Sequence, residues 1–366
     1  MSLLITTQSY RNDVATEYGL LLEVDNQTGE ILRTKRIDTP TLTEGFNERI
    51  KPGLRGIYIY KNEIYTATWN TIYVLDVQTL EVKRSFTHKW MSDLHGIFVD
   101  DDGVWVTSSY PDAMILYDFE GNPRATLWCP ETFLYDTRSV VDKEMDWSQR
   151  GKEFRGFHDY HANNVEVHGD YVYVTGRSNL NGRLARIHKD TFIAKGNVTD
   201  EDIVLFTKGL LGPHDGTWVD NHVYLTETMG STLVCLNEKG KVEFRIKVKV
   251  DEKEKDPRKL SALENLRKQV ASLVKGRPNL DKTTHWTRGL AITADHYYVG
   301  QSTWAGDEES RARVVKIDRK TREIQGAFYL DIPDYPETRI YQVLDVETAL
   351  AKADHSAHSS HSTVHS

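Results

Sequence analysis

Three histidines stand at corresponding places in the chain, each at or just before an apolar, strand-like run. They are His95 in "LHGIFV", His161 in "HANNVEV" and His214 in "HDGTWV". Three neutral imidazoles can bind a divalent transition metal and leave a coordination position open for water or substrate. Without a metal, His95 or His161 can act directly as a general acid or base, because the imidazole pKa lies near neutrality. The third reading is that each histidine only hydrogen-bonds a neighbouring loop.

Charged and aromatic residues share these places. The positions before the strand-like runs hold Arg55, Asn163, Asp215, Arg288 and Arg339, with Trp286 slightly upstream. The ends of the following runs hold Trp69, Tyr110, Arg177, Glu227 and Trp304. If these residues converge, the arginines and aromatics would bind an anionic substrate, with Asp215 or Glu227 as a base. The alternatives are that the arginines pair with Asp93, Asp215 or Glu227, and that the tryptophans pack between sheets.

A repeated unit supplies the elements that would bring these residues together. Each copy is an alternating strand, a polar turn, a second strand ending in Thr, Ser or Gly, a third strand and a fourth. Five complete copies begin at Leu54, Leu94, Ala162, His214 and Thr287. Four antiparallel strands repeated in this way are typical of a β-propeller blade. Since the first strands of all blades start at one face around the axis, the residues at those starts should meet there.

The two chain ends complete a sixth blade. "LLITTQSY" and "GLLLEVDNQTGEILRTKRI" supply three strands, and "TRIYQVLDV" from Thr338 supplies the missing first strand, with Arg339-Ile340 aligned to Arg55-Gly56. Pairing the ends within one sheet would close the ring and remove exposed sheet edges. We therefore predict an all-β, six-bladed β-propeller over residues 1–350, with two independent β-sandwiches as the alternative.

Three segments depart from the repeat. Residues 128–160 and 251–284 are insertions, and the second includes a predicted helix over 256–275 whose leucines share one face. Long insertions in compact domains are often binding loops. Residues 351–366 form a His- and Ser-rich tail that is too polar to fold, so we predict that it is disordered.

Composition limits the partners. The chain has 366 residues, 39% of them hydrophobic, and a net charge of −8. Such a chain can bury a sizeable core and has no general attraction to nucleic acid or membrane surfaces. Cys129 and Cys235 are too far apart for a CxxC motif, so neither disulfides nor a thiolate zinc site is indicated. The N-terminal "MSLLITTQSY" reads as a strand rather than a signal peptide, and we expect a cytoplasmic protein.

The segments "LHGIFVDDDGVWVTSS" and "PHDGTWVDNHVYLTET" resemble the inner hairpins of the six-bladed propellers that include NHL-repeat proteins, the gluconolactonase group and strictosidine synthase. The peptidyl-hydroxyglycine amidating lyases are the most similar of these. That resemblance implies a histidine-held catalytic zinc, with His95 and His214 matching the pattern and His161 matching it loosely. Only Asn163 and Asp215 match the ligands with which the gluconolactonase group holds calcium.

These observations predict an enzyme that acts on a small polar or anionic metabolite at the axial mouth by lyase, hydrolase or isomerase chemistry. A zinc- or iron-type metal site would use His95, His161 and His214. The alternative is a non-catalytic propeller that binds a ligand or partner protein on the same face.

Overall fold

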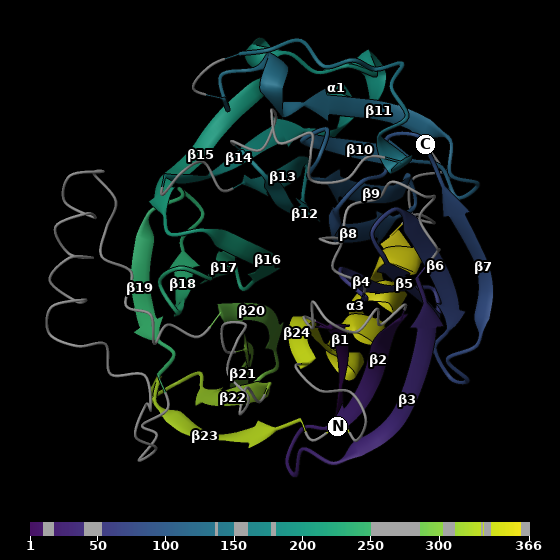
Figure 1. The fold of residues 1–366 in the computed structure, drawn as a ribbon. Coiled ribbons are helices and arrows are strands. Elements are labelled where there is room, and N and C mark those ends of the chain that lie inside the picture. The colour runs from purple at the N-terminus through teal and green to yellow at the C-terminus, as the bar shows by residue number, and fades with distance from the viewer. Residues whose placement is uncertain are drawn as a thin grey trace, which may run out of the picture.

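The chain forms a ring of six antiparallel, four-stranded sheets (Figure 1), so the predicted six-bladed β-propeller is confirmed. The computed structural model describes residues 1–9, 18–39, 53–135, 138–149, 160–176, 181–249, 286–302, 312–330, 332 and 338–359. Each described blade buries alternating apolar side chains against its neighbours, so the hydrophobic core lies between blades. None of the described helices is long and apolar enough to cross a membrane.

The strands are numbered along the chain and the blades from the first complete one. Blade 1 holds β4 (Ile57–Tyr60), β5 (Glu63–Ala67), β6 (Thr71–Asp76) and β7 (Val82–Thr87). Blade 2 holds β8 (Leu94–Asp100), β9 (Gly103–Ser108), β10 (Ala113–Tyr117) and β11 (Pro123–Trp128). Blade 3 holds β12 (Ala162–His168), β13 (Tyr171–Gly176), β14 (Gly182–His188) and β15 (Ile203–Leu210).

The second half of the ring follows the same order. Blade 4 holds β16 (Pro213–Val219), β17 (His222–Glu227), β18 (Thr232–Leu236) and β19 (Val242–Lys247). Blade 5 holds β20 (Trp286–Ile292), β21 (His296–Ser302), β22 (Arg313–Asp318) and β23 (Ile324–Tyr329). Blade 6 holds β24 (Thr338–Asp345), β1 (Ser2–Ser9), β2 (Tyr18–Asp25) and β3 (Ile31–Asp38). β24 pairs with β1, which is the predicted closure by the two chain ends.

The insertions have different outcomes. Within residues 128–160, the described part contains the short 3-10 turns η1 (Cys129–Glu131) and η2 (Trp147–Gln149), and it buries Trp147 and Tyr135 in the core between blades. A helix absent from our prediction, α1 (Lys189–Lys195), follows β14. The insertion 251–284 and its predicted helix lie outside the described residues.

The C-terminal tail differs from the prediction. Helix α3 (Val346–Ser359) includes residues 351–359, which we predicted to be disordered. Asp345 accepts the Thr348 N–H at 2.8 Å and so caps the first turn, and the Ala- and Leu-containing start of the helix favours helical structure. Buried Ala349 packs against the core that includes Ile57 and Ile59 of β4. The polar Ser and His content of the tail favours disorder, and the packing of the first helical turn on β4 outweighs it.

Candidate functional site

One residue from the start of each innermost strand forms a set that we call the axial ring. Its members are Arg55, His95, Asn163, Asp215, Arg288 and Tyr341. In blades 2 to 6 the strand register shifts at this residue, so it lies in a β-bulge. In blade 1, Arg55 precedes Gly56 and β4 in the same way, and its N–H donates to Ala67 of β5. Bulges turn side chains out of the regular pleat, which lets six distant residues face one axis.

Contacts between blades show that the ring residues meet. The Tyr341 ring lies 5.5 Å from the His95 ring, and the guanidinium groups of Arg55 and Arg288 lie 5.7 and 5.2 Å from its centroid. The Asp215 carboxylate accepts the N–H of Gly289, the residue after Arg288, at 2.9 Å. The side chain of Tyr341 therefore crosses the axis and joins blade 6 to blades 1, 2 and 5.

Glycine follows four of the ring residues because the innermost strands approach closely. A Cβ on Gly96 would lie 2.6 Å from Asn164 Cα, and a Cβ on Gly56 would lie 2.4 Å from the His95 carbonyl oxygen. Both contacts are with backbone atoms, which cannot move aside without shifting a neighbouring blade. The geometry of the ring thus depends on the absence of a side chain next to it.

The charge of the site is unbalanced toward cations. Arg55 pairs with Asp93 at 2.5 Å, and Arg288 faces Asp215. Arg339 and Arg288 both lie over the Trp286 ring, at 5.0 and 4.8 Å. Burial lowers the pKa of Arg288. Burial also raises the pKa of Asp215 to about 6, because desolvation outweighs its hydrogen bonds and the nearby guanidinium.

His95 has a defined tautomer. Its Nδ1 lies 2.7 Å from the Asp93 carbonyl oxygen, which can only accept, so Nδ1 carries the proton and Nε2 carries the lone pair. Ser109 lies 3.0 Å from the same nitrogen and donates its own proton to the Ala162 carbonyl. Burial, with help from Arg55 and Arg288, lowers the pKa of His95 to about 3. The imidazole is therefore neutral at physiological pH.

The backbone at His161 is held by a buried acid that sequence reasoning did not find. The carboxylate of Asp112 accepts the N–H groups of His161 and Ala162, each at 2.8 Å, and the hydroxyl of Tyr135. Burial raises the pKa of Asp112 to about 7. His161 has φ 51°, in the left-handed region, as does Asp93 at the corresponding place in blade 2, with φ 53°. Tyr135 belongs to the 128–160 insertion, which therefore helps to fix one side of the site.

The group of potential metal ligands in the structure differs from the three predicted histidines. The ligand atoms of Asp93, His95 and His161 lie within 4.8 Å of one another, and His214 is not part of this group. His214 instead stacks on His95, with ring centroids 6.2 Å apart and an interplanar angle of 24°. The Asp93 carboxylate already binds Arg55, and further guanidinium groups lie nearby. The positive charge of these guanidinium groups disfavours a divalent cation at Asp93, His95 and His161.

Glu227 does not join the axial ring. It is fully buried within blade 4, where it accepts hydrogen bonds from the Leu211 N–H, the Thr232 hydroxyl and the Arg245 guanidinium. These contacts tie strands of one blade together, and the arginine involved is Arg245 rather than one of the arginines predicted at the mouth. We leave Glu227 out of the proposed chemistry.

Some of the predicted aromatic residues lie in the core between blades, and one lies at the axial ring. Trp69 and Tyr110 belong to the core between blades 1 and 2, where their rings lie 5.0 Å apart. The Arg55 guanidinium lies 5.0 Å from the Trp69 ring and connects it to the axial ring. Of the predicted aromatic residues that the structure describes, Trp286 is the one that stays partly exposed, and it lies beside two arginines of the site. The predicted Arg177 and Trp304 lie outside the described residues.

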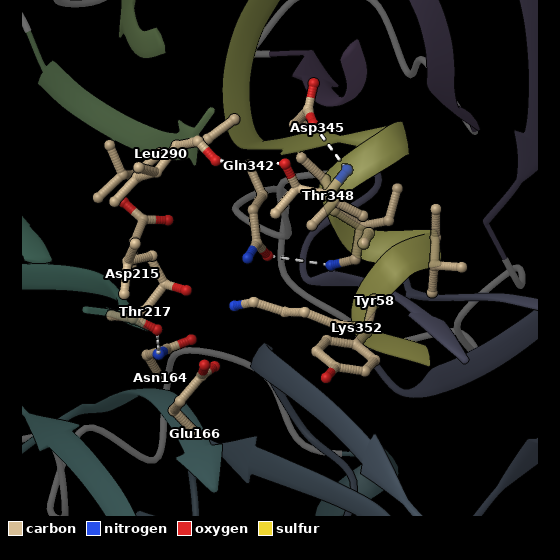
Figure 2. Close-up of a pocket in the computed structure, with 18 of the residues that line it drawn as sticks. Tyr58, Asn164, Glu166, Asp215, Thr217, Leu290, Gln342, Asp345, Thr348 and Lys352 are labelled. Carbon is tan, nitrogen blue, oxygen red and sulfur yellow. Dashed lines mark hydrogen bonds between the residues drawn. The ribbon is translucent and has the colours of Figure 1, made fainter. Parts of the chain in front are cut away.

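A small cavity of about 70 Å³ lies along the axis beyond the ring (Figure 2). Asp215, Glu166, Thr217 and Gln342 line it, and α3 covers it, with Lys352 pointing into it. Burial raises the pKa of Glu166 to about 7, although Lys352 opposes the shift. The cavity has room for a few ordered waters and not for a metabolite. This cavity is therefore too small to be the proposed substrate site.

Four of the six ring residues carry a buried polar atom without a hydrogen-bond partner among the described residues. These atoms are Arg55 Nε, Asn163 Oδ1, Arg288 Nε and the Tyr341 hydroxyl. The Asn163 amide nitrogen donates to the Pro213 carbonyl at 2.9 Å, which fixes the direction of its oxygen. Buried polar atoms in proteins are nearly always bonded to protein or ordered water. Their concentration here indicates that water or a polar ligand belongs at the ring.

Comparison with known proteins supports the fold and goes no further. No family model matches the chain, and no curated protein matches it. Among solved structures, one of a nidogen/laminin complex is similar at 12% identity and TM-score 0.55, covering 94% of this chain and 98% of that one. A protein of unknown function from Bacteroides caccae is similar at 11% identity and TM-score 0.54, over the same shares of the two chains. At such identity the similarity shows the propeller fold alone.

Proposed function

We propose that the chain is an enzyme that binds a small anionic metabolite at the axial ring and acts on it by acid–base chemistry, as a lyase, hydrolase or isomerase. The observation that carries the proposal is the convergence of one bulge residue from each blade, with four of them holding an unpartnered buried polar atom. A ligand with several oxygens would supply the missing partners.

Arginine side chains would provide the affinity. Arg288 and Arg339 both lie over the Trp286 ring, and a carboxylate or phosphate bound by these guanidinium groups would replace the hydration that their burial removes. The Asn163 oxygen and the Tyr341 hydroxyl would orient hydroxyl or carbonyl groups of the same ligand.

Two groups would move protons. His95 Nε2 offers a lone pair while Nδ1–H stays bonded to the Asp93 carbonyl, so this imidazole can accept a proton from a bound hydroxyl. Binding of an anion would offset the two nearby guanidinium charges and make the imidazole more basic. Asp215, with its pKa raised to about 6, can exchange a proton near neutral pH and lines both the ring and the cavity. We assign no step to a metal, because the surrounding guanidinium charge opposes one.

The proposal is tested by ligand-induced thermal stabilisation at constant ionic strength. The probes are inorganic phosphate and a panel of small carboxylates and phosphate esters, with chloride as the reference. We expect at least one probe to raise the Tm of the wild type and to lose most of that effect in Arg288→Gln. Arg33→Gln, at a partly exposed outer-strand arginine, is the control for loss of positive charge. Equal shifts in all three proteins would contradict binding at the ring.

A non-catalytic propeller that binds a ligand or partner protein at the same ring is the second candidate, because the unpartnered buried atoms of the ring call for a bound group and not for a reaction. The two candidates separate when a stabilising probe is incubated with the protein in D₂O and followed by proton NMR. Turnover or solvent exchange that is lost in His95→Gln supports an enzyme. An unchanged ligand supports a binding protein.

A further inference from the structure

Away from the axial ring, three potential metal ligands come together in a groove of about 540 Å³ between blades 4 and 5. They are His222 of β17, Cys235 of β18 and Glu243 of β19, and their ligand atoms all lie within 4.8 Å of one another. Imidazole, thiolate and carboxylate are the ligand types that zinc takes. The three residues have no CxxC or HxxxH spacing, so the sequence does not indicate this group. They are close together because their strands are neighbours in one sheet.

His222 is oriented like a metal ligand. Its Nδ1 lies 2.6 Å from the Asp220 carbonyl oxygen, so the proton is on Nδ1 and the Nε2 lone pair faces outward. That lone pair lies 3.1 Å from the Glu243 carboxylate. Two acceptors at this distance repel each other unless a positive charge joins them. The charge is either a second proton on the imidazole or a bound cation.

A bulge directs Glu243 toward the groove. Phe244 pairs with Cys235 and Val242 pairs with Leu236, so Glu243 is the extra residue on β19. In a regular strand Glu243 and Phe244 would point to opposite faces of the sheet. The bulge lets the carboxylate reach the side of the sheet that holds Cys235.

Blade 5 provides an internal comparison. His296 occupies the place of His222, and its Nε2 lies 3.0 Å from Gln325, the residue in the corresponding bulge of β23. Lys316 pairs with Tyr298 as Cys235 pairs with Tyr224, so an ammonium group replaces the thiol. Blade 5 thus joins imidazole to a neutral amide, whereas blade 4 combines a carboxylate and a thiol around the same imidazole.

The groove tolerates added positive charge. Arg319 is held by the Thr293 carbonyl and by Asp220, and Arg322 lies over the Phe244 ring at 3.9 Å. Four carboxylates line the groove against three cationic side chains. The carboxylates are Asp220, Glu243, Asp295 and Asp318, and the cations are Arg319, Lys320 and Arg322.

We propose that His222, Cys235 and Glu243 bind a divalent transition-metal ion of the zinc type. The Cys235 thiol would release its proton to water and bind as thiolate, and His222 Nε2 and one Glu243 oxygen would complete three protein ligands. A water molecule would take the fourth position in the groove. The site is independent of the axial chemistry.

The test is titration of the full, reduced chain with Co²⁺, because a cobalt–thiolate bond gives a near-ultraviolet charge-transfer band that histidines of the C-terminal tail cannot produce. We expect the band to saturate at one equivalent and to disappear when Zn²⁺ is added. Cys235→Ser should abolish it, and Cys129→Ser, at the other buried cysteine, should retain it. Glu243→Gln should weaken binding at least tenfold, and His296→Ala should leave it unchanged.

Two results would overturn the proposal. One is the absence of the band in folded wild type, which would leave a protonated His222–Glu243 ion pair as the reason for their contact. The other is a band that persists in Cys235→Ser or disappears in Cys129→Ser. If Cys235→Ser does not fold, His222→Asn takes its place, and an unchanged cobalt affinity in that variant would likewise refute the site.

Discussion

The two ends of the propeller axis are built from the same six strands and differ in their chemistry. At the mouth, bulges at the strand starts turn Arg55, His95 and Arg288 toward the axis, and arginines outnumber the facing carboxylates. At the other end, Glu166 and Asp215 line a small cavity that α3 covers with Lys352 (Figure 2). Irregular backbone at one end creates a place for a ligand, and an added helix closes the other end.

This difference is the reason that we place the proposed site at the mouth. Among the described residues, four ring residues at the mouth hold a buried polar atom without a partner. The cavity at the far end has one such atom, Asp345 Oδ2, and Lys352 gives Glu166 an internal counter-charge there. A protein gains nothing in stability from unpartnered buried polar atoms. Ligand binding at the mouth, as proposed above, would account for these atoms, and the following changes test the contrast.

The largest effect should come from Gly96→Ala. The added methyl group would lie 2.6 Å from the Asn164 Cα and would push apart blades 2 and 3. We expect a loss of about 3 kcal/mol in unfolding free energy, as for overpacking of a close-packed interior. Gly169→Ala is the control, because a Cβ there has no neighbour within 4 Å. It should lose about 1 kcal/mol of unfolding free energy, the cost of a left-handed backbone for a residue with a side chain. Urea unfolding measures both, and equal losses would show that close strand approach does not set the ring.

An intermediate effect should follow Tyr135→Phe. It removes the hydroxyl that donates to the buried Asp112 carboxylate, which also holds the backbone of His161. Hydrogen bonds to charged groups contribute about 1.5–3 kcal/mol, so we expect a loss of about 2 kcal/mol and weaker ligand binding at the mouth. Tyr160→Phe removes a hydroxyl bonded to the neutral Val174 carbonyl and should lose about half as much. Unchanged ligand binding in Tyr135→Phe would separate the insertion from the site.

A pH-dependent effect should follow Glu166→Gln. Because the pKa of Glu166 is raised to about 7 in the folded state, the folded protein holds this proton more tightly than the unfolded chain does. Its stabilising contribution is present below the ordinary glutamate pKa and is lost as pH rises through about 7. Glu166→Gln should therefore gain stability relative to wild type at pH 8 and lose that advantage at pH 5. A difference that does not depend on pH would refute the shift.

Most of the ring could be predicted because a similar pattern, often a polar residue followed by glycine, begins the innermost strand of each blade. Five of the six ring residues were among the predicted site residues, and the sixth was displaced by two positions. We aligned Arg339-Ile340 with Arg55-Gly56, whereas the structure places Tyr341-Gln342 there. Gln342 replaces the usual glycine, and its side chain accepts the Ile57 N–H at 3.0 Å, so the glycine signal was missing in this blade.

Other features could not be read from the repeat. Asp112 and Tyr135 act through the folded insertion, and Lys352 reaches the axis only because α3 packs beneath the ring. Glu227 was predicted from its place at the end of a second strand, but Arg245 and Thr232 of its own blade bind it. Position along a strand predicts which residues converge. Partners from other segments decide what those residues do.

The most direct test of the account is a crystal structure of the protein soaked in selenate, measured at the selenium absorption edge. We predict an anomalous peak on the axis, within hydrogen-bonding distance of Arg288 and at least one of Arg55, Asn163 and Tyr341. Peaks confined to the outer surface, with these ring atoms bonded to one another, would contradict an anion site at the propeller mouth.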